Sequence, residues 1–483
     1  MKKSTFDKIY RKKMQLPEPF VLRMQQLLGT EYPDFVNALS QNSNVSVRIN
    51  PIKHPGELTR EKVDYCQTGY FLPVRPIFTL DPLFHSGVYY VQEASSMFLE
   101  QAVKAATPDK NAKILDLCAA PGGKSTHLAT LLNGNGLLVS NEVIRSRAQI
   151  LSENLKKWGV KNVIVTNNDP SDFQRLTGFF DCIVIDAPCS GEGLFRRDEE
   201  AIGEWSIDNA ALCAQRQRRI VADTWPALKE NGLLIYSTCT YNQAENEENI
   251  KWLSEFAEIE AIEIPLHHNW GIVQTNANGI PGYRFYPHKT LGEGFFTAVV
   301  RKKQREKEAF SKKTKDNQLI VSKVQREQAQ KLLADNDCEL LTINDTIIAF
   351  PRPYMADLLR IKESFRIVHA GIKIGEFKQK ELIPAHELAL SEIISPDYFS
   401  AIELPIEQAL RYLKRDEFVA RSSEKGWNLV KYQQIPLGWA KNLGNRFNNG
   451  YPKEWRIRMD IAAYQGERLA DEMQKFPIDT PAV

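Results

Sequence analysis

Short apolar runs alternate with segments of helical spacing between about residues 112 and 302. The apolar runs are "AKILDLC", "GLLVSNE", "NVIVTNND", "FDCIVIDAP", "GLLIYSTC" and "FTAVVRK". Between them, "KSTHLATLL" and "IRSRAQILSENLKKWG" have the spacing of helices. Strands that alternate with helices are typical of a parallel, doubly wound sheet. We therefore predict an α/β domain with a Rossmann-like sheet over residues 106–302.

The flanking regions follow other patterns. Residues 1–105 mix helical stretches with the runs "VSVRINPIK" and "GYFLPV", which indicates a small α+β module. The segment "RKKQREKEAFSKKTKDNQ" has eight Lys or Arg against three Asp or Glu and no apolar periodicity. Residues 303–318 are therefore predicted to form a basic linker. A separate domain is expected over residues 319–483, where short β-type runs are divided by turn residues.

Composition narrows the class of protein. The 483 residues are 43% hydrophobic with a net charge of +2, which suits two to four packed domains. No apolar stretch reaches the roughly 18 residues of a membrane span, and no apolar core of a secretory signal follows the basic N-terminus. The seven cysteines include no CxxC pair, so we expect free thiols. These features predict a soluble, cytoplasmic protein.

The stretch "ILDLCAAPGGKSTHLATLL" contains a glycine turn whose ligand must be identified. A phosphate-binding P-loop requires a glycine where this chain has Cys118, which disfavours a nucleotide triphosphatase. The turn follows a strand that ends at Asp116, and the next strand ends at Glu142, which suits the two hydroxyls of a ribose. Asp169, at a third strand end, can accept a hydrogen bond from an adenine amino group. This pattern predicts S-adenosylmethionine; the alternative for each acid is a helix cap.

Two further strands end in "IDAPCSGEG" and "YSTCTYNQAENEE", which brings Cys189 and Cys239 to the same rim. A thiolate that adds to C6 of a pyrimidine makes C5 nucleophilic enough to take a methyl group. Asp186 can hydrogen-bond the N3/N4 edge of a cytosine and stabilise its protonation as the thiol adds. The alternative for a lone cysteine is a small buried residue. Spacing alone does not say which cysteine attacks.

The motifs "DLCAAPGGKS", "DAPCSGEG" and "STCTYNQAENE" closely resemble the signatures of the NOL1/NOP2/Sun family of RNA cytosine-5 methyltransferases. "SVRINPIK", "YYVQEASSM" and "YRFYPHKTLGEGFF" look like its flanking motifs, so the resemblance covers about residues 45–302. It implies a class I S-adenosylmethionine-dependent methyltransferase domain, with Cys239 as the covalent nucleophile and Cys189 assisting product release. The donor contacts that it implies are Cys118, Ala119, Ala120, Pro121, Gly122, Gly123, Lys124, Glu142, Asp169 and Asp186.

The C-terminal tail is similar to a PUA-like RNA-binding module. Together with the length and the "GEGLFRRDEEA" turn, it resembles bacterial family members that act on small-subunit ribosomal RNA. The resemblance implies methylation of a cytosine in the decoding-site region of 16S ribosomal RNA, by a monomer without a metal. Transfer RNA and large-subunit RNA remain open as substrates. A non-catalytic ribosome assembly factor is the alternative from another functional class.

Basic clusters are candidate RNA contacts, although each also suits a solvated surface. They are Arg48 and Lys53; Arg196 and Arg197; Arg216, Arg218 and Arg219; and, in the tail, Lys441, Arg446, Lys453, Arg456 and Arg458. Phe447, Tyr451 and Trp455 lie among the tail residues and suit base stacking. His127 has no partner at metal-ligand spacing, so a structural or RNA-facing role is expected for it.

Overall fold

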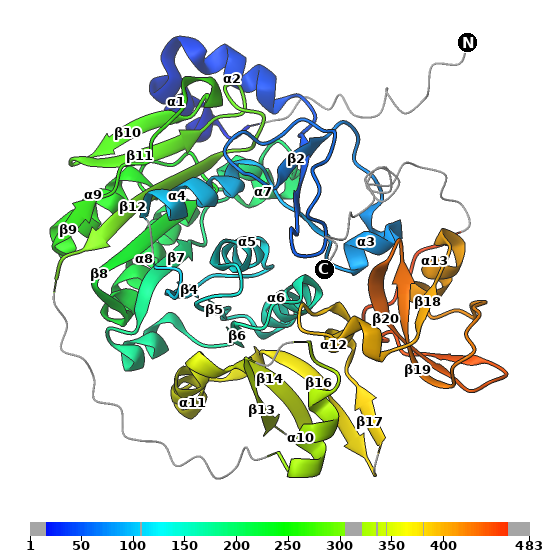
Figure 1. Ribbon diagram of the computed structural model, residues 1–483. Helices are drawn as coiled ribbons and strands as arrows, with labels where there is room; N and C mark the ends of the chain where they lie inside the picture. The colour runs from blue at the N-terminus through cyan, green and yellow to red at the C-terminus, as the bar shows by residue number, and fades with distance from the viewer. Residues whose placement is uncertain are drawn as a thin grey trace, which may run out of the picture.

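The computed structural model describes residues 16–106, 109–304, 321–334, 337–343, 345–379 and 381–461. A large sheet runs through the molecule, with helices against it and three smaller sheets around it (Figure 1). Residues 305–318 of the predicted linker lie outside the described residues. Within the described ranges, no helix has both the length and the apolar character needed to span a membrane.

The central sheet has ten strands in the order β10-β11-β12-β8-β7-β4-β5-β6-β15, and β9 pairs with β12. The bounds of its first nine strands are β4 (Lys113–Asp116), β5 (Leu137–Asn141), β6 (Val163–Thr166), β7 (Phe180–Asp186), β8 (Leu228–Thr238), β9 (Ile259–Ala261), β10 (Val273–Ala277), β11 (Ile280–Phe285) and β12 (Phe295–Lys302). Strands β4 to β8 are parallel, as predicted. The run "FTAVVRK" forms β12, which lies antiparallel to β8 and departs from the parallel prediction.

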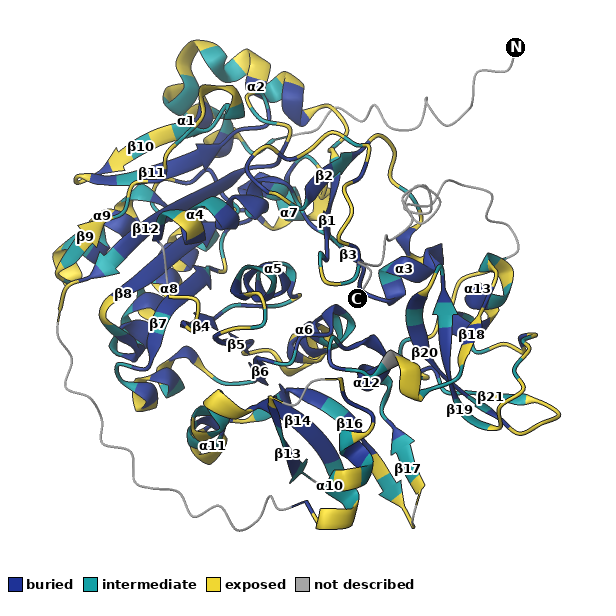
Figure 2. Cartoon of the chain, in the orientation of Figure 1, coloured by how far each residue is buried: buried dark blue, intermediate teal, exposed yellow. Residues whose placement is uncertain are grey.

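Both faces of the parallel strands are buried, which explains their continuous apolar runs. Successive residues of β4 enter different cores: Ile114 packs with Leu128 and Leu155, and Leu115 packs with Phe173 and Ile220. The helices of this region are α5 (Gly123–Leu132), α6 (Arg145–Trp158), α7 (Glu199–Glu204), α8 (Ile207–Thr224) and α9 (Glu247–Phe256). Figure 2 shows the buried strands in the interior and exposed residues on the outer elements.

The N-terminal module is α+β, as expected. Its elements are α1 (Glu18–Leu28), α2 (Tyr32–Leu39), β1 (Val45–Ile49), β2 (Gly69–Leu72), α3 (Pro82–His85), β3 (Tyr89–Val91) and α4 (Leu99–Ala106). The three strands form an antiparallel sheet in the order β2-β1-β3. Phe20 and Phe35, from the first two helices, pack against Tyr241, two residues after Cys239. The module therefore packs against the segment that carries Cys239 at the rim of the central sheet.

The segment after the predicted linker joins the central sheet. Its elements are α10 (Lys323–Gln330), β13 (Cys338–Ile343), β14 (Thr346–Pro351), α11 (Met355–Ser364), β15 (Ile367–Ala370), β16 (Ile372–Lys378), β17 (Glu381–Pro384) and α12 (His386–Leu390). Four of these strands form their own sheet, but β15 pairs antiparallel with β6. The ring centroids of Phe365 and Phe173 lie 4.9 Å apart. Residues on both sides of position 318 therefore share one hydrophobic core.

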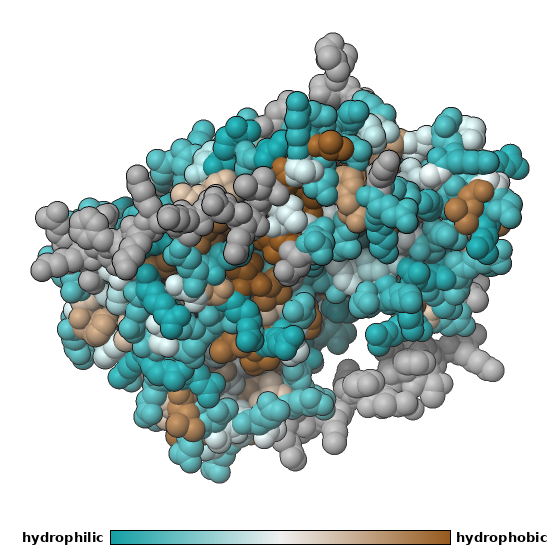
Figure 3. All heavy atoms as spheres, turned by 90° about the horizontal axis from the view of Figure 1, so that it is seen from below, coloured by the Kyte–Doolittle hydropathy of each residue, from teal (hydrophilic) through white to brown (hydrophobic). Residues whose placement is uncertain are grey.

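The C-terminal part forms a four-stranded sheet, β18-β19-β20-β21. Its elements are β18 (Ala401–Glu403), α13 (Ile406–Lys414), β19 (Gly426–Tyr432), β20 (Ile435–Asn442) and β21 (Phe447–Asn449). Tyr412 and Leu437 share a core with Val47 and Tyr89 of the N-terminal module. Figure 3 shows a mostly hydrophilic face on which hydrophobic side chains gather near the middle.

Candidate active site

Five parallel strands bring polar side chains to one rim of the central sheet. Asp116 ends β4 and Asp186 ends β7, whereas Glu142, Asp169 and Cys239 follow the ends of β5, β6 and β8. In the sheet, β5 lies on one side of β4 and β7 lies on its other side, so the order of strands reverses at β4. This reversal of strand order opens a crevice in doubly wound sheets, where ligands bind. All five residues therefore lie where the sequence predicted a site.

The glycine turn between β4 and α5 is tightly packed. Gly122 has a φ of +119°, and a Cβ there would lie 3.3 Å from Leu151. The backbone carbonyl oxygens of Ala120 and Pro121 accept hydrogen bonds from Arg147, at 3.0 Å, and Asn154, at 2.8 Å. Helix α6 thus fixes the position of the turn from behind.

Asp116 offers an unused acceptor beside this turn. Its Oδ2 accepts a hydrogen bond from Ser125 Oγ at 2.6 Å, whereas its buried Oδ1 has no hydrogen-bond partner among the residues that the structure describes. Burial raises the pKa of this carboxyl to about 7. An α-ammonium group such as that of S-adenosylmethionine can donate to Oδ1 and favour the charged carboxylate. The residues present therefore fit this donor.

The other predicted donor contacts have local partners as well. Glu142 is buried; its Oε1 accepts from the backbone N–H of Ile144 at 2.9 Å, and its Oε2 lies 3.6 Å from Arg147. Asp169 is exposed, and its Oδ1 caps a short 3-10 helix by accepting from Ser171 N at 3.0 Å. Asp169 thus has the capping contact that was its alternative explanation, whereas Glu142 accepts from the N-cap residue of α6 without capping that helix. Their contacts with a donor stay predictions.

The two rim cysteines lie side by side. The Sγ atoms of Cys189 and Cys239 are 3.0 Å apart, and the backbone N–H of Cys239 donates to Cys189 Sγ at 3.3 Å. The hydrogen bond with Cys239, together with burial, raises the pKa of the Cys189 thiol well above its ordinary value. Cys189 is therefore a protonated thiol at neutral pH, able to donate its S–H toward Cys239.

Asp186 is held at the same rim by two partners. Ser237 Oγ donates to its Oδ1 at 2.8 Å, and Lys124 Nζ lies 2.8 Å from its Oδ2. The Asp186 side chain keeps 36% of its surface exposed. Ser237 and Lys124 fix the orientation of the carboxylate, and its exposed part can hydrogen-bond a ligand. Lys124 links it directly to the glycine turn.

Sequence reasoning missed Glu245, which ties the two cysteine loops together. Its Oε2 accepts from Ser190 N at 2.9 Å and from Gln217 Nε2 at 2.8 Å, and its Oε1 accepts from Ser190 Oγ. The hydroxyls of Ser190 and Thr240, neighbours of the two cysteines, are 2.9 Å apart. Burial raises the pKa of Glu245. Glu245 lies inside "YNQAENEE", but nothing in its spacing separates it from the other acids there.

Several predicted RNA contacts are wrong because their side chains are buried. Arg48 is fully buried; it donates to Gln92 Oε1 at 2.9 Å, and its guanidinium lies 4.6 Å from the Trp158 ring centroid. Lys53 is half-buried; its Nζ already donates to the backbone carbonyl oxygen of Ser86, and burial of the ammonium group lowers its pKa to about 7.

Two further predicted contacts are corrected for the same reason. Arg196 forms a buried ion pair with Glu293 at 2.9 Å. Tyr451 is completely buried, and its hydroxyl lies 3.1 Å from His85 Nδ1. Arg218 is half-buried and donates to Asn249. The predicted positions that remain exposed are Arg197, Arg216, Arg219, Arg446, Lys453, Arg456 and Arg458.

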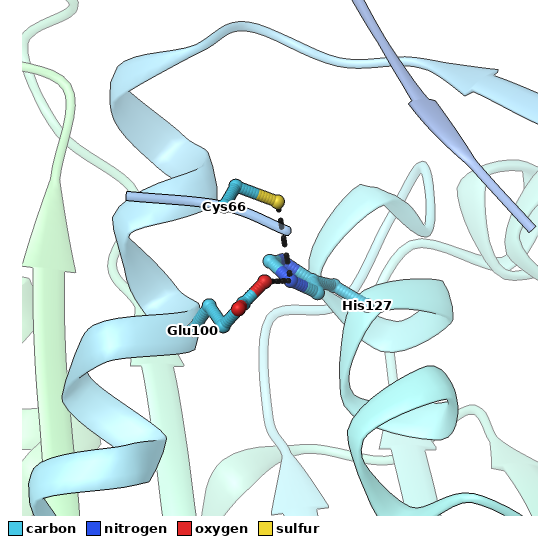
Figure 4. Close-up of side chains that lie close together, drawn as sticks. All are labelled: Cys66, Glu100 and His127. Atoms are coloured by element: carbon cyan, nitrogen blue, oxygen red, sulfur yellow. Dashed lines mark hydrogen bonds and ion pairs between the residues drawn. The ribbon is translucent and has the colours of Figure 1, made fainter. Parts of the chain in front are cut away.

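Cys66, Glu100 and His127 form a buried cluster behind α5 (Figure 4). Burial lowers the pKa of His127 to about 4, so its ring is neutral at pH 7, 3.4 Å from Glu100. The Glu100 carboxylate also accepts from Gln67 N and Lys104 Nζ, and burial raises the pKa of Cys66 to about 12. The hydrogen bond between Cys66 and His127 and the contacts of the Glu100 carboxylate hold the three elements together, so we assign the cluster a packing role. It joins the N-terminal module, through Cys66 and through Glu100 of α4, to α5.

Three family models match successive parts of the chain. The model described as N-terminal domain of 16S rRNA methyltransferase RsmF matches residues 16–94. The model for 16S rRNA methyltransferase RsmB/F matches residues 103–301, and the model for the methyltransferase RsmF PUA domain matches residues 399–457. The PUA match begins after the segment that contributes β15.

Matches to individual proteins agree with the matches to the family models. The chain is 32% identical to the ribosomal RNA small subunit methyltransferase F of Vibrio atlanticus, over 91% of this chain and 97% of that protein. It is also 32% identical to the protein of that name from Escherichia coli O157:H7, over 91% and 96%. Among solved structures, a methyltransferase homologue from Pyrococcus horikoshii is 29% identical with a TM-score of 0.51, covering 60% of this chain and 96% of that chain.

Proposed function

The chain belongs to the family of ribosomal RNA small subunit methyltransferases F, and we propose that it methylates C5 of a specific cytosine in 16S ribosomal RNA. Methylation of ribosomal RNA with S-adenosylmethionine as donor is the activity of the family. The base position, a covalent cysteine adduct and a target in the decoding-site region are our proposal. Action as a monomer and on the assembled small subunit stay predictions.

The observation that carries the proposal is the contact between Cys189 and Cys239 beside Asp186. Methylation at C5 of cytosine needs a nucleophile for C6 and a base for the proton on C5. Because Cys189 is held as a thiol, Cys239 is the better candidate for the attacking thiolate. A hydrogen bond from the Cys189 thiol would stabilise that thiolate. Two adjacent sulfurs, of which Cys189 is the one with the raised pKa, thus suit two different roles.

In the proposed reaction, the Cys239 thiolate forms a bond with C6, and the electron pair of the C5–C6 double bond becomes available at C5. S-adenosylmethionine, when bound, supplies an electrophilic methyl group. Asp186 hydrogen-bonds the N3/N4 edge of the cytosine and favours its protonation during the attack. Loss of the C5 proton to a base then restores the double bond, and the C6–S bond breaks with its electron pair returning to Cys239.

Cys189 is the proposed base for this last step. In the free enzyme, its contact with Cys239 is the first cause of its raised pKa. Once Cys239 is bonded to C6, its sulfur carries no charge, so the repulsion that keeps Cys189 protonated falls. Cys189 can then release its proton to solvent and, as a thiolate, accept the proton on C5. The order of the two roles therefore follows from the coupling between the two thiols.

Bisulfite sequencing of total RNA tests the proposal. RNA is compared from a deletion strain and from the same strain that expresses the wild-type chain or Cys239→Ala. We expect one 16S cytosine to be protected only when the wild-type chain is present. A protected cytosine in transfer RNA or large-subunit RNA would correct the substrate. No protected cytosine anywhere would overturn C5 methylation.

A further inference from the structure

A cavity lies between the N-terminal module and α6. Its volume is about 580 Å³, which is in the usual range for sites that hold small organic groups. The loop that begins at Arg75, the strand β3 and the last turn of α6 supply its walls. Five aromatic rings line it: Phe78, Phe84, Tyr89, Tyr90 and Trp158.

Two of these rings have their polar atoms already paired outside the cavity. The Tyr89 hydroxyl donates to Asp81 at 2.9 Å, and Trp158 Nε1 donates to Thr130 Oγ1 at 3.3 Å. Phe78 and Phe84 carry no polar group, and their ring centroids are 6.3 Å apart. Phe78, Tyr89 and Trp158 are at most 9% exposed, so the apolar ring surface open to a ligand comes mainly from the half-buried Phe84 and Tyr90. Such a surface suits a flat, unsaturated group.

The charges around the cavity have a single sign. Of the described residues that line it, Arg75 and Lys157 are the charged ones, and none is Asp or Glu. Lys157 pairs with Glu153 at 2.6 Å, but Arg75 is exposed and has no ion pair within the described residues. The Arg75 guanidinium lies 5.5 Å from the Phe78 ring centroid, beside Ile77, which is 42% exposed. An aromatic cavity with a cation at its mouth complements a base that carries its phosphate.

The cavity also adjoins the donor turn. A Cβ on Gly123 would lie 3.4 Å from Cε1 of Tyr90, and Asn154, another lining residue, donates to the Pro121 carbonyl oxygen. One wall of the cavity is thus in contact with the turn that leads into α5. A strand of RNA held here would lie close to the methyltransferase domain rather than on the PUA domain alone.

We propose that this cavity binds an unstacked base of the substrate RNA, from a nucleotide that flanks the target cytosine. The proposal rests on the RNA-methylating function given above. A cytosine must leave its stack to reach a buried thiolate, and the strand on either side loses stacking as it does so. Stacking of a neighbouring base on these rings, with its phosphate at Arg75, would replace part of that loss. Ring stacking accepts any base, so the cavity would add affinity with little sequence preference.

Fluorescence anisotropy with the full-length protein tests the cavity without methyl transfer. The probe is a labelled ten-nucleotide oligouridylate, which contains no target cytosine, and its comparison is an abasic ribose-phosphate strand of equal length. For the wild-type protein, we expect the base-bearing strand to bind more tightly. Tyr90→Leu keeps apolar bulk but removes a ring, so it should weaken oligouridylate binding about tenfold and leave abasic binding unchanged.

Substitutions at two exposed positions keep the test decisive if Tyr90→Leu does not fold. Ile77→Glu places a carboxylate at the mouth and should weaken binding severalfold more than Ile77→Gln. Arg75→Ala should weaken binding of both strands, whereas Arg352→Ala, on the distant α11 side of the molecule, should change neither. Equal affinity of wild type and all cavity variants for oligouridylate would overturn the inference. Since no step depends on C5 chemistry, a base-dependent loss in these variants would support the cavity even if the bisulfite experiment failed.

Discussion

The Sγ atoms of Cys189 and Cys239 lie 3.0 Å apart, although 50 positions separate the two residues in the chain. Parallel pairing of β7 with β8 brings them together, since each cysteine follows the end of its strand. The backbone N–H of Gly193 donates to the Cys239 carbonyl oxygen at 2.9 Å and ties the second loop to the first. Each sulfur therefore sets the chemical environment of the other, and removing one tests the role of both.

Replacement of Cys239 with Ala should abolish methyl transfer and leave donor binding intact. The thiolate attacks the base and does not contact the donor in the proposed reaction. Methyl transfer from labelled S-adenosylmethionine to 16S RNA and calorimetric titration of the donor measure the two effects. A Cys239→Ala enzyme with near wild-type turnover would contradict the assignment of the nucleophile.

Replacement of Cys189 with Ala should trap the reaction after the attack. Without a base for the C5 proton, the C6–S bond cannot break, so a protein–RNA adduct that resists denaturant should accumulate. Denaturing gel electrophoresis with labelled RNA detects it, and the Cys189→Ala/Cys239→Ala double variant should show none. If Cys189→Ala turns over normally and no adduct appears, Cys189 has only a structural role.

Donor affinity should rise with pH near neutrality because of Asp116. The carboxyl pKa is raised to about 7 in the folded protein, so the group is neutral at lower pH and becomes an anion above that value. An α-ammonium stays charged up to about pH 7.5, so the dissociation constant should fall roughly five- to tenfold between pH 6 and 7.5. Titration calorimetry measures this change. Asp116→Asn should bind more weakly and show a flat profile over the same range; a wild-type slope in that variant would remove Asp116 from the site.

Glu245→Gln should slow turnover without loosening donor binding. The amide is neutral and has only one acceptor oxygen, so it cannot reproduce every bond that Glu245 makes to Ser190 and Gln217. The loop that carries Cys189 should shift, and small displacements of reacting groups cost roughly 10- to 100-fold in rate. Glu248→Gln is the matched control, because Glu248 lies in the same motif but is exposed. Equal turnover rates for the two variants would mean that Glu245 does not position the cysteine.

The strands of the central sheet could be predicted because local pattern decides them. Apolar runs bounded by turn residues mark β4 to β8, and the carboxyl ends of parallel strands meet at one rim regardless of the details of packing. This is why Asp116, Asp186 and the two cysteines were found together from sequence. The residue types that bear the chemistry stand directly at strand ends.

Burial of polar residues could not be predicted in the same way. The sequence predicts an exposed Arg48 because arginine is usually exposed, but Gln92, Thr126 and Trp158 from distant parts of the chain enclose it. Glu245 is likewise enclosed by Ser190 and Gln217. Such partners are set by tertiary packing, and the sequence around each residue carries no sign of them.

The pairing of β15 with β6 was missed for a related reason and leads to a last prediction. Four residues, "IVHA", carry too little pattern to identify an edge strand whose partner lies some 200 positions earlier.

Phe365 precedes this strand and packs on Phe173 of the methyltransferase domain. Phe365→Ala should lower the free energy of unfolding of the whole domain by about 3–5 kcal/mol, the usual cost of a buried Phe. Lys362→Ala, at an exposed position of α11 just before Phe365, should change it by less than about 0.5 kcal/mol. Chemical denaturation followed by tryptophan fluorescence and by loss of donor binding should give one shared transition. Two separate transitions, with donor binding unaffected by Phe365→Ala, would instead mean that the segments on either side of residue 318 fold independently.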